Sequence, residues 1–449
     1  MFAEYMGKRL LLYIFLASVS IPSFGQKVWS LEECINHAWE NNLTVKQKMV
    51  EVERGRNNLV KSKADFAPSI NADIGYHLNW GRSVDLQNLE IIRNKLSQST
   101  SASVSASVYI LDGLSKLYTL KSESKSLEIS LQEVESLKNE ISISIAKCYL
   151  QILLAKEILS ASESNFRSIT GQRDRTRLLV DAGSQPYTAL LDMESQLASE
   201  RLQLVTAQSQ VTTSTLELMQ LLDLPYGEEF AVSAPDTSSA PLLYIPENVE
   251  EIYLQAVTMP TIRSAELSVE RGDLELKKAK GQYYPKISLS GSYGTFYSSS
   301  SYAPDGSTYP FFEQFRDNIN PSIGIGLSIP IFNKLNVRAS VRNAELTKAS
   351  LEIDLQIKHQ ALYKEIQTAV TEAETYFRKM EAAKANTAAM EESFRYVEEK
   401  FNAGALNGTD YIVAKTNLFR AESEYLQAKY QYLFQLKIID YYKGIPLSM

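Results

Sequence analysis

The strongest constraint on the fold of this 449-residue chain is that it contains the same pattern twice. Segments separated by 221 residues resemble one another: Ile110–Asp112 and Ile331–Asn333, Ala182–Gly183 and Ala403–Gly404, Leu224–Pro225 and Ile445–Pro446. Nearer the start, 68–76 resembles 285–293 at an offset of 217, and 31–38 resembles 249–256 at an offset of 218. The order is the same in both copies. A repeat this long is no solenoid unit, so we predict two copies of one half-domain.

The first residues have the pattern of an export signal. Lys8 and Arg9 precede the apolar run Leu10–Val19, and small residues stand at Ser23 and Gly25. A charged start, a short apolar run and small residues near a cleavage site are typical of a secretory signal peptide. We therefore expect residues 1–25 to be removed, 26–225 and 249–449 to be the two repeats, and 226–248, rich in Ser, Pro and Glu, to link them.

The composition excludes several classes of protein. The whole chain has a formal charge of −7, and an acidic exported chain is not a nucleic-acid binder. After the signal no apolar stretch reaches 18 residues, which excludes a membrane-spanning helix. With only Cys34 and Cys148 after the signal, the chain is no disulfide scaffold. The two could pair in an oxidising compartment, but both stand at apolar helical positions, where an unpaired cysteine acts as a small hydrophobe. The sequence has no metal-ligand spacing, phosphate-binding loop or catalytic motif, so we predict no cofactor, no metal and no enzyme activity.

Each copy contains one very long helix, predicted near 115–182 and near 336–402. A 4,3,4,3 stepping from Leu120 to Leu159 meets ten apolar residues in twelve positions, which is the spacing of a coiled coil. Lys138 in the first copy and His359 in the second are polar residues at equivalent places in this seam. Their role is to specify the register, to extend a charged end to the surface, or to sense protons. Shorter helices are expected near 43–66 and 261–283. After a glycine-containing turn, returning helices are expected near 188–223 and 409–443.

Two β-strands are predicted between the helices of each copy, at about 68–80, 99–110, 286–298 and 320–331. Apolar residues alternate with Ser, Gly, Asn and Asp throughout these segments. Each has the length of a tilted membrane strand, with aromatic residues towards the ends. A soluble antiparallel sheet with one wet face has the same alternation. If these are membrane strands, four cannot close a barrel, so several chains would have to share one.

Together these features resemble the TolC-type outer-membrane efflux proteins, over about residues 30–446. The closest agreement is at the second helical turn, Phe401-Asn-Ala-Gly404-Ala-Leu-Asn407-Gly-Thr-Asp410. The first turn, Val180-Asp-Ala-Gly183-Ser-Gln-Pro186, departs from the family pattern, which puts equal roles for the two turns in doubt.

The resemblance implies a mixed α/β membrane protein that forms a homotrimer. Its long antiparallel helical hairpins would build an α-barrel across the periplasm, and its four strands per chain would join in one trimeric 12-stranded β-barrel in the Gram-negative outer membrane. Residues near 30–45, 226–260 and 440–449 would form an equatorial belt. The implied work is passive conduction of substrates supplied by a periplasmic adaptor and an inner-membrane pump of the RND or ABC type.

The resemblance also assigns roles to particular residues. Adaptor docking falls on the turns, at Gly183, Ser184, Ala403, Gly404 and Ala405, and both glycines are expected in the left-handed conformation. Aromatic residues of the membrane interfaces would be Tyr76, Trp80, Tyr293 and Tyr297, contacting outer-membrane lipid. The loops at 81–98 and 300–319 would face outside. Aromatic residues of the second, from Tyr302 to Phe315, would either constrict the mouth or pack on their neighbours.

A periplasmic gate is implied at Asp410, with Asp192 as a weaker candidate because Ala189 replaces the matching acid. Three-fold symmetry would make Asp410 a ring of carboxylates that attracts cations. An Asp in the first helical turn also complements the helix dipole, and both interpretations stay open.

Two other functions share parts of the pattern. The exit duct of a type I protein secretion system has the same architecture. A non-conducting, periplasm-spanning tether is less consistent with strands that recur in both halves.

Overall fold

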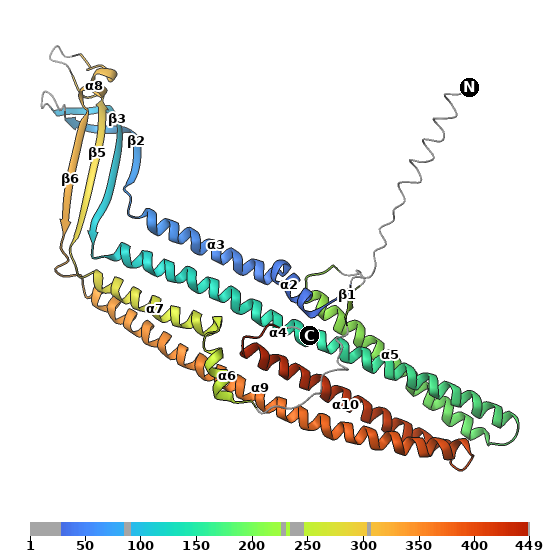
Figure 1. Ribbon diagram of the computed structural model, residues 1–449. Coiled ribbons are helices and arrows are strands. Elements are labelled where there is room, and N and C mark those ends of the chain that lie inside the picture. Colours follow the sequence, from blue (N-terminus) through green and yellow to red (C-terminus); the bar gives the residue numbers. More distant parts are fainter. Residues whose placement is uncertain (1–27, 85–90, 226–229, 234–246, 303–306, 448–449) are drawn as a thin grey trace, which may run out of the picture. The chain divides into compact units, whose positions relative to one another are not determined.

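The computed structural model of the protein describes residues 28–84, 91–225, 230–233, 247–302 and 307–447 (Figure 1). The expected signal peptide and most of the expected linker lie outside these residues. The fold is mostly helical with one main sheet. Its elements are β1 Val28–Trp29, α2 Leu31–Asn41, α3 Leu43–Ala64, β2 Ser69–Val84, β3 Ile91–Asp112, α4 Ser115–Asp181, α5 Tyr187–Leu221, β4 Ala231–Val232, α6 Val249–Ala256, α7 Pro260–Gly281, β5 Lys286–Ser298, α8 Phe311–Asp317, β6 Asn320–Ser328, α9 Asn336–Asn402 and α10 Gly408–Tyr442.

The chain divides into two compact units, and α4 and α9 contribute to both. One unit comprises Gln47–Ser136 and Val257–Ala361. It holds an antiparallel sheet in the order β2-β3-β5-β6, so that the strand pair of each repeat lies beside that of the other (Figure 1). The helices of this unit are joined by ion pairs, among them Lys125–Glu270 at 3.0 Å and Lys348–Asp273 at 3.0 Å.

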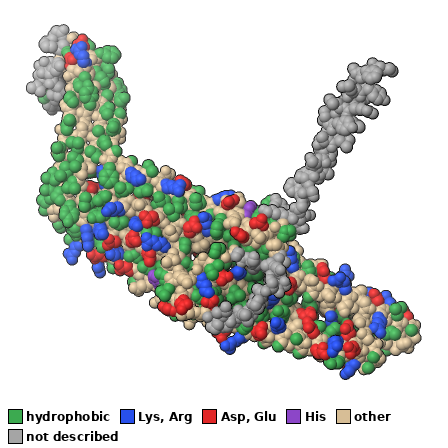
Figure 2. All heavy atoms as spheres, in the orientation of Figure 1, with side chains coloured by type: hydrophobic (Ala, Val, Ile, Leu, Met, Phe, Trp, Pro, Cys, Tyr) green, Lys and Arg blue, Asp and Glu red, His purple; other side chains and the backbone are tan. Residues whose placement is uncertain are grey.

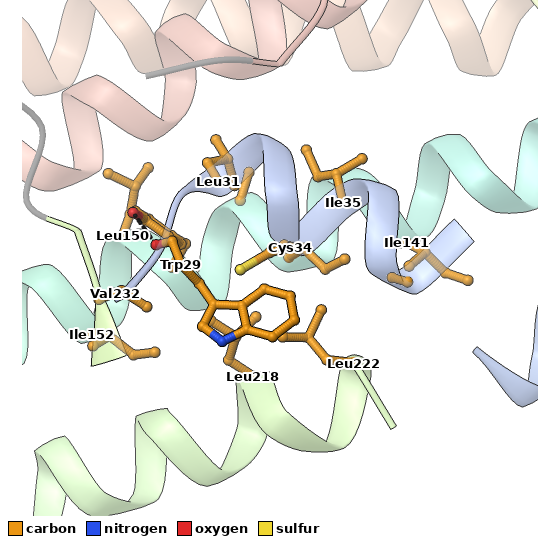
Figure 3. Close-up of a cluster of buried hydrophobic side chains, with 14 of the residues drawn as sticks. Trp29, Leu31, Cys34, Ile35, Ile141, Leu150, Ile152, Leu218, Leu222 and Val232 are labelled. Carbon is orange, nitrogen blue, oxygen red and sulfur yellow. Dashed lines mark hydrogen bonds between the residues drawn. The ribbon is translucent and has the colours of Figure 1, made fainter. Parts of the chain in front are cut away.

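The other unit contains two helical hairpins, α4 with α5 and α9 with α10 (Figure 1). Its main core lies where the short parallel strands β1 and β4 pack on α2, α4 and α5 (Figure 3). Trp29, Cys34 and Ile145 are buried there. The Tyr149 hydroxyl lies 2.7 Å from the Ser233 carbonyl oxygen and 3.1 Å from that of Trp29, which joins the two short strands to α4.

The long helices agree with the sequence prediction to within one residue at each end. In α4 the predicted seam is buried at Val134, Ile141, Ile145 and Ile152, whereas Leu131 is 40% exposed. Among the described residues, the seam is therefore buried along only part of its length.

Two strands are longer than predicted. β2 continues to Val84 and β3 begins at Ile91, so the expected loop at 81–98 is wrong except at 85–90, which lies outside the described residues. The apolar alternation stops near Trp80, but backbone pairing continues past an irregularity between Gly81 and Ser83. Pairing needs no apolar side chains, so the extension leaves no pattern in the sequence.

Candidate functional site

The registers of the four strands bring their alternating residues together on two faces. Val104 lies between Ala72 on β2 and Tyr293 on β5, and Tyr293 lies opposite Pro321 on β6. Ile325 lies opposite Leu289 in the same way. Since side chains alternate between faces, these apolar residues share one face of the sheet. The alternation seen in each segment is therefore one continuous apolar surface.

Solvent reaches this apolar face in the single chain. Ile74 is 83% exposed, Ile323 86% and Trp80 75%. Figure 2 shows hydrophobic side chains over the strands, with charged ones gathered on the helices. Apolar patches of this extent on a protein surface indicate contact with a membrane or another protein.

The opposite face consists mainly of small polar residues, with His77, Tyr109 and Phe296 as larger members. The Ser69 and Ser107 hydroxyls lie 3.1 Å apart, and those of Ser292 and Ser322 lie 2.8 Å apart. Gly324 and Gly326 continue this face on β6. Such a face suits contact with water, so the sheet is amphipathic through its whole width.

Within the described sheet, β2 and β6 each have one neighbouring strand. Each therefore presents an edge of backbone N–H and C=O groups, which is a template for pairing with another strand.

The four predicted interface aromatics all lie on the apolar face, at three different levels. Tyr76 and Tyr297 both lie opposite Thr100 and form one row. Tyr293 lies four residues closer to the helices, and Trp80 lies four residues further out.

A second set of aromatics, which the sequence reasoning missed, flanks the helix-proximal ends of the strands. Phe66, Tyr283, Tyr284 and Phe332 are exposed there. The repeat could have revealed this set from the sequence. Phe66 and Tyr283 are separated by 217 residues, the same offset as the strands that follow them.

The two long hairpins turn through the same backbone motif. Gly183 has φ 69° and Gly404 has φ 74°, which confirms the predicted left-handed conformation. At each turn the glycine N–H donates to the carbonyl three residues back, and the next N–H donates five back, from Ser184 to Leu179 and from Ala405 to Lys400. This pair of bonds is the Schellman motif. Gly183, Ser184, Ala403, Gly404 and Ala405 are all exposed.

The helices after the two turns begin differently. The Asn407 side chain accepts a 2.8 Å hydrogen bond from the Asp410 backbone N–H and caps α10. Pro186, at the corresponding place before α5, makes no side-chain cap. Asp410 is exposed in the first turn of α10, and Asp192 is exposed in the second turn of α5. The departure of the first turn from the family pattern thus has a structural counterpart.

Near the turns a small core joins the two hairpins. Tyr411, fully buried, packs with Ile169, Phe394 and Leu418. Burial raises the pKa of Tyr411, so its hydroxyl stays protonated. Arg175 of α4 donates a 2.7 Å hydrogen bond to the Asn402 side chain at the end of α9.

The polar interruption of the first seam lies beside an aromatic ring. The Lys138 ammonium lies 5.8 Å from the centre of the Trp39 ring, and the indole N–H donates to the Ser142 hydroxyl at 3.0 Å. This arrangement agrees with a lysine that packs its stem along apolar surface. Cys34 and Cys148 are both thiols.

The described residues hold neither a metal site nor a helix that crosses a membrane. Among them no His, Cys, Asp and Glu cluster has the geometry of a metal site. None of the described helices combines the length and apolarity needed to cross a bilayer.

Comparison with known proteins places the chain among outer-membrane transport proteins. The Escherichia coli outer membrane protein TolC is 22% identical over 76% of this chain and 69% of its own length. The Pseudomonas aeruginosa outer membrane protein OprJ is 20% identical over 92% of this chain and 83% of its own. A solved structure of CusC, described as forming a transmembrane channel, has a TM-score of 0.79, 18% identity, and coverage of 95% and 96%.

The family assignment follows from a match to most of the chain. The family described as outer membrane efflux protein matches residues 34–223 and 253–437. The chain belongs to this family, and its location is the outer membrane.

Proposed function

We propose that three copies of the chain close a 12-stranded barrel in the outer membrane and form the exit duct of a tripartite efflux system. The observation that carries the proposal is the amphipathic sheet with two open edges. In lipid an unpaired strand edge costs several kcal/mol per group, so the edges must meet other strands. Two copies would supply eight strands, whose interior is filled by side chains, whereas three leave room for a water-filled lumen lined by the polar face.

The internal repeat supplies the pairing between copies. β3 and β5 pair within one chain. The repeat equivalent of β3 is β6, 221 residues later, and the repeat equivalent of β5 is β2, 217 residues earlier. The same register between copies therefore pairs β6 of one with β2 of the next. Val104 with Tyr293 becomes Ile325 with Tyr76 of the neighbouring copy.

The polar pairs transfer in the same way. Ser107 with Ser290 becomes Ser328 with Asp73 of the neighbouring copy. Apolar residues thus meet apolar residues and polar residues meet polar ones across the junction. A shift by one residue would reverse this match, which supports closure in this register.

The remaining roles follow from the family. The exposed turns at Gly183 and Gly404 dock a periplasmic adaptor that connects to an inner-membrane RND or ABC-type pump, and Asp410, with Asp192, lies at the periplasmic gate.

We also propose the division into a signal peptide at 1–25, repeats at 26–225 and 249–449 and a linker at 226–248, which the two matched segments support. The chain conducts passively, without catalysis.

A second candidate is the exit duct of a protein secretion system. It rests on a relative named alkaline protease secretion protein AprF, from Pseudomonas aeruginosa, 20% identical over 71% of this chain. Deleting the gene distinguishes the two functions: loss of resistance to small toxic compounds supports efflux, and loss of an exported protein supports secretion. A non-conducting tether predicts neither.

Disulfide cross-linking tests the assembly and its register together. Ser328→Cys with Asp73→Cys, with Cys34 and Cys148 replaced by Ala, should give covalent trimers on mild oxidation. The matched control, Ser328→Cys with His77→Cys, displaces one thiol by four residues, about 13 Å along the strand, and should stay uncross-linked. Equal cross-linking of both pairs contradicts the register, and the absence of trimers in all samples contradicts the assembly.

A further inference from the structure

The short helix α8 takes the place of a strand at the outer end of the sheet. β6 begins at Asn320, opposite Gly294, so within the described part of the chain the last four residues of β5 have no strand on that edge. The Gln314 side-chain amide fills the position: its oxygen accepts from the Ser298 N–H at 3.0 Å, and its nitrogen donates to the Ser298 carbonyl at 3.0 Å.

Further bonds fix the helix in that position. The Asn318 side chain donates to the Phe296 carbonyl at 2.8 Å, and the Thr295 hydroxyl donates to the Phe315 carbonyl at 2.6 Å. Gln314 itself is 2% exposed. A side chain that satisfies both backbone groups of an edge residue holds α8 as part of the sheet rather than as a loose loop.

The aromatic side of α8 continues the apolar face. Tyr297 lies on that face, and its ring centre is 4.8 Å from that of Phe311. Phe311 stacks on Phe315 at 5.1 Å and contacts Phe312 at 5.4 Å. Phe312 nevertheless remains 84% exposed.

Polar groups of the same segment gather around Asp317. Arg316 pairs with the Asp317 carboxylate at 2.9 Å, and the Tyr309 hydroxyl donates to the same carboxylate at 2.8 Å. Glu313, one turn before Asp317, is exposed. The segment therefore combines a phenylalanine cluster with a charged, hydrogen-bonded group, a combination that suits the boundary between lipid and water.

We infer that α8 is a membrane anchor whose phenylalanines insert among the outer-leaflet lipids at the boundary between headgroups and acyl chains. The inference rests on the proposed barrel, because continuity with the lipid-facing surface identifies the occupant. It also decides between the two roles expected for this loop. Phe311 contacts Tyr297 of the apolar face and carries Phe312 and Phe315 against itself, which places this cluster on the lipid side of the sheet rather than across the mouth.

Spin labelling in proteoliposomes tests this placement. Single cysteines at Phe312 and Glu313, with the native cysteines replaced by Ala, carry a nitroxide whose collisions with oxygen and with a water-soluble nickel complex are compared. Labels at Ile323 on the apolar face and Ser290 on the polar face serve as references. We expect the oxygen-to-nickel ratio at Phe312 to be severalfold higher than at Glu313 and to approach that at Ile323.

The references separate the two proposals. A watery ratio at Ile323 overturns the barrel itself. A high oxygen-to-nickel ratio at Ile323 with a low one at Phe312 overturns the anchor alone. A label at Phe312 that neither reagent reaches also overturns the anchor, because Phe312 would then be covered by protein. To exclude an effect of the label, Phe312→Trp in a Trp80→Phe background should be quenched by lipids brominated near the headgroup, relative to Trp80→Phe alone.

Discussion

At the residue scale, two glycine backbones of the sheet-containing unit meet at close range. Gly113, between β3 and α4, has φ 68°, and a Cβ placed on it would overlap the carbonyl of Gly281 at the end of α7. A Cβ on Gly281 would overlap the carbonyl of Gly113 in turn. This junction therefore tolerates no side chain on either residue.

Gly113→Ala should destabilise the protein by about 3 kcal/mol or more, because it adds a steric clash to an unfavourable φ. Few trimers should then reach the outer membrane. The control is Gly171→Ala within α4, where a Cβ meets nothing within 4 Å and the change should stabilise the helix by up to ~1 kcal/mol. Both are measured as the amount of trimer and its dissociation temperature. Normal amounts of Gly113→Ala trimer would contradict the packing of this junction.

Asp410 gives a second prediction at this scale. Under the proposed assembly, Asp410→Ala should lower cation selectivity in planar bilayers and weaken block by multivalent cations added from the periplasmic side, because the ring of carboxylates is lost. Asp410→Glu, which keeps the charge, should retain both properties. If selectivity and block are unchanged in Asp410→Ala while stability falls, Asp410 acts only at the start of the helix and the gate lies elsewhere.

Individual residues also mark the limit of what the sequence could predict. Gly183 and Gly404 were predictable, because glycine before a returning helix favours the left-handed conformation. Leu114, Asp223, Lys334 and Leu335 also have positive φ. Asp223 was predictable in part, because Asp tolerates positive φ and this residue corresponds to Gly444 at the offset of 221. The conformations of Leu114, Lys334 and Leu335 are imposed by the strand–helix junctions, and nothing in these side chains signals them.

At the scale of elements, the helices were predictable because periodicity repeats over many turns. The ends of α4 and α9 could be placed closely because a glycine turn follows each. The sequence did not predict the outer parts of β2 and β3 or the helix α8, because these segments lack a periodic pattern. The strand ends are held by backbone pairing, and α8 is held by the Gln314 amide.

The turn between α9 and α10 gives a prediction at this scale. Ala403 and Ala405 are exposed on both sides of Gly404, where a bulky charge would obstruct the helical tips of an adaptor. Ala405→Arg should abolish efflux, measured as drug resistance, while trimers remain in the outer membrane. Ala405→Ser, a matched small substitution, should keep efflux intact. Unchanged resistance in Ala405→Arg would contradict docking at this turn.

At the scale of the whole molecule, the described sheet is incomplete within one chain. Its apolar face is exposed and two of its edges are open, although the sheet is internally well paired. The sequence predicted both faces from alternation, and it predicted from the strand count that copies must combine. The inter-copy register additionally required the observed pairing of β3 with β5.

The central claim is that the polar faces of three copies line one water-filled pore. It is tested most directly by single-channel recording of Ser290→Cys and Leu289→Cys, neighbours on opposite faces of β5, with the native cysteines replaced by Ala. A charged, water-soluble thiol reagent should change the conductance of Ser290→Cys channels in three equal steps, one per copy, and leave Leu289→Cys channels unchanged. A response at Leu289 but not at Ser290, or a number of steps other than three, would contradict the account.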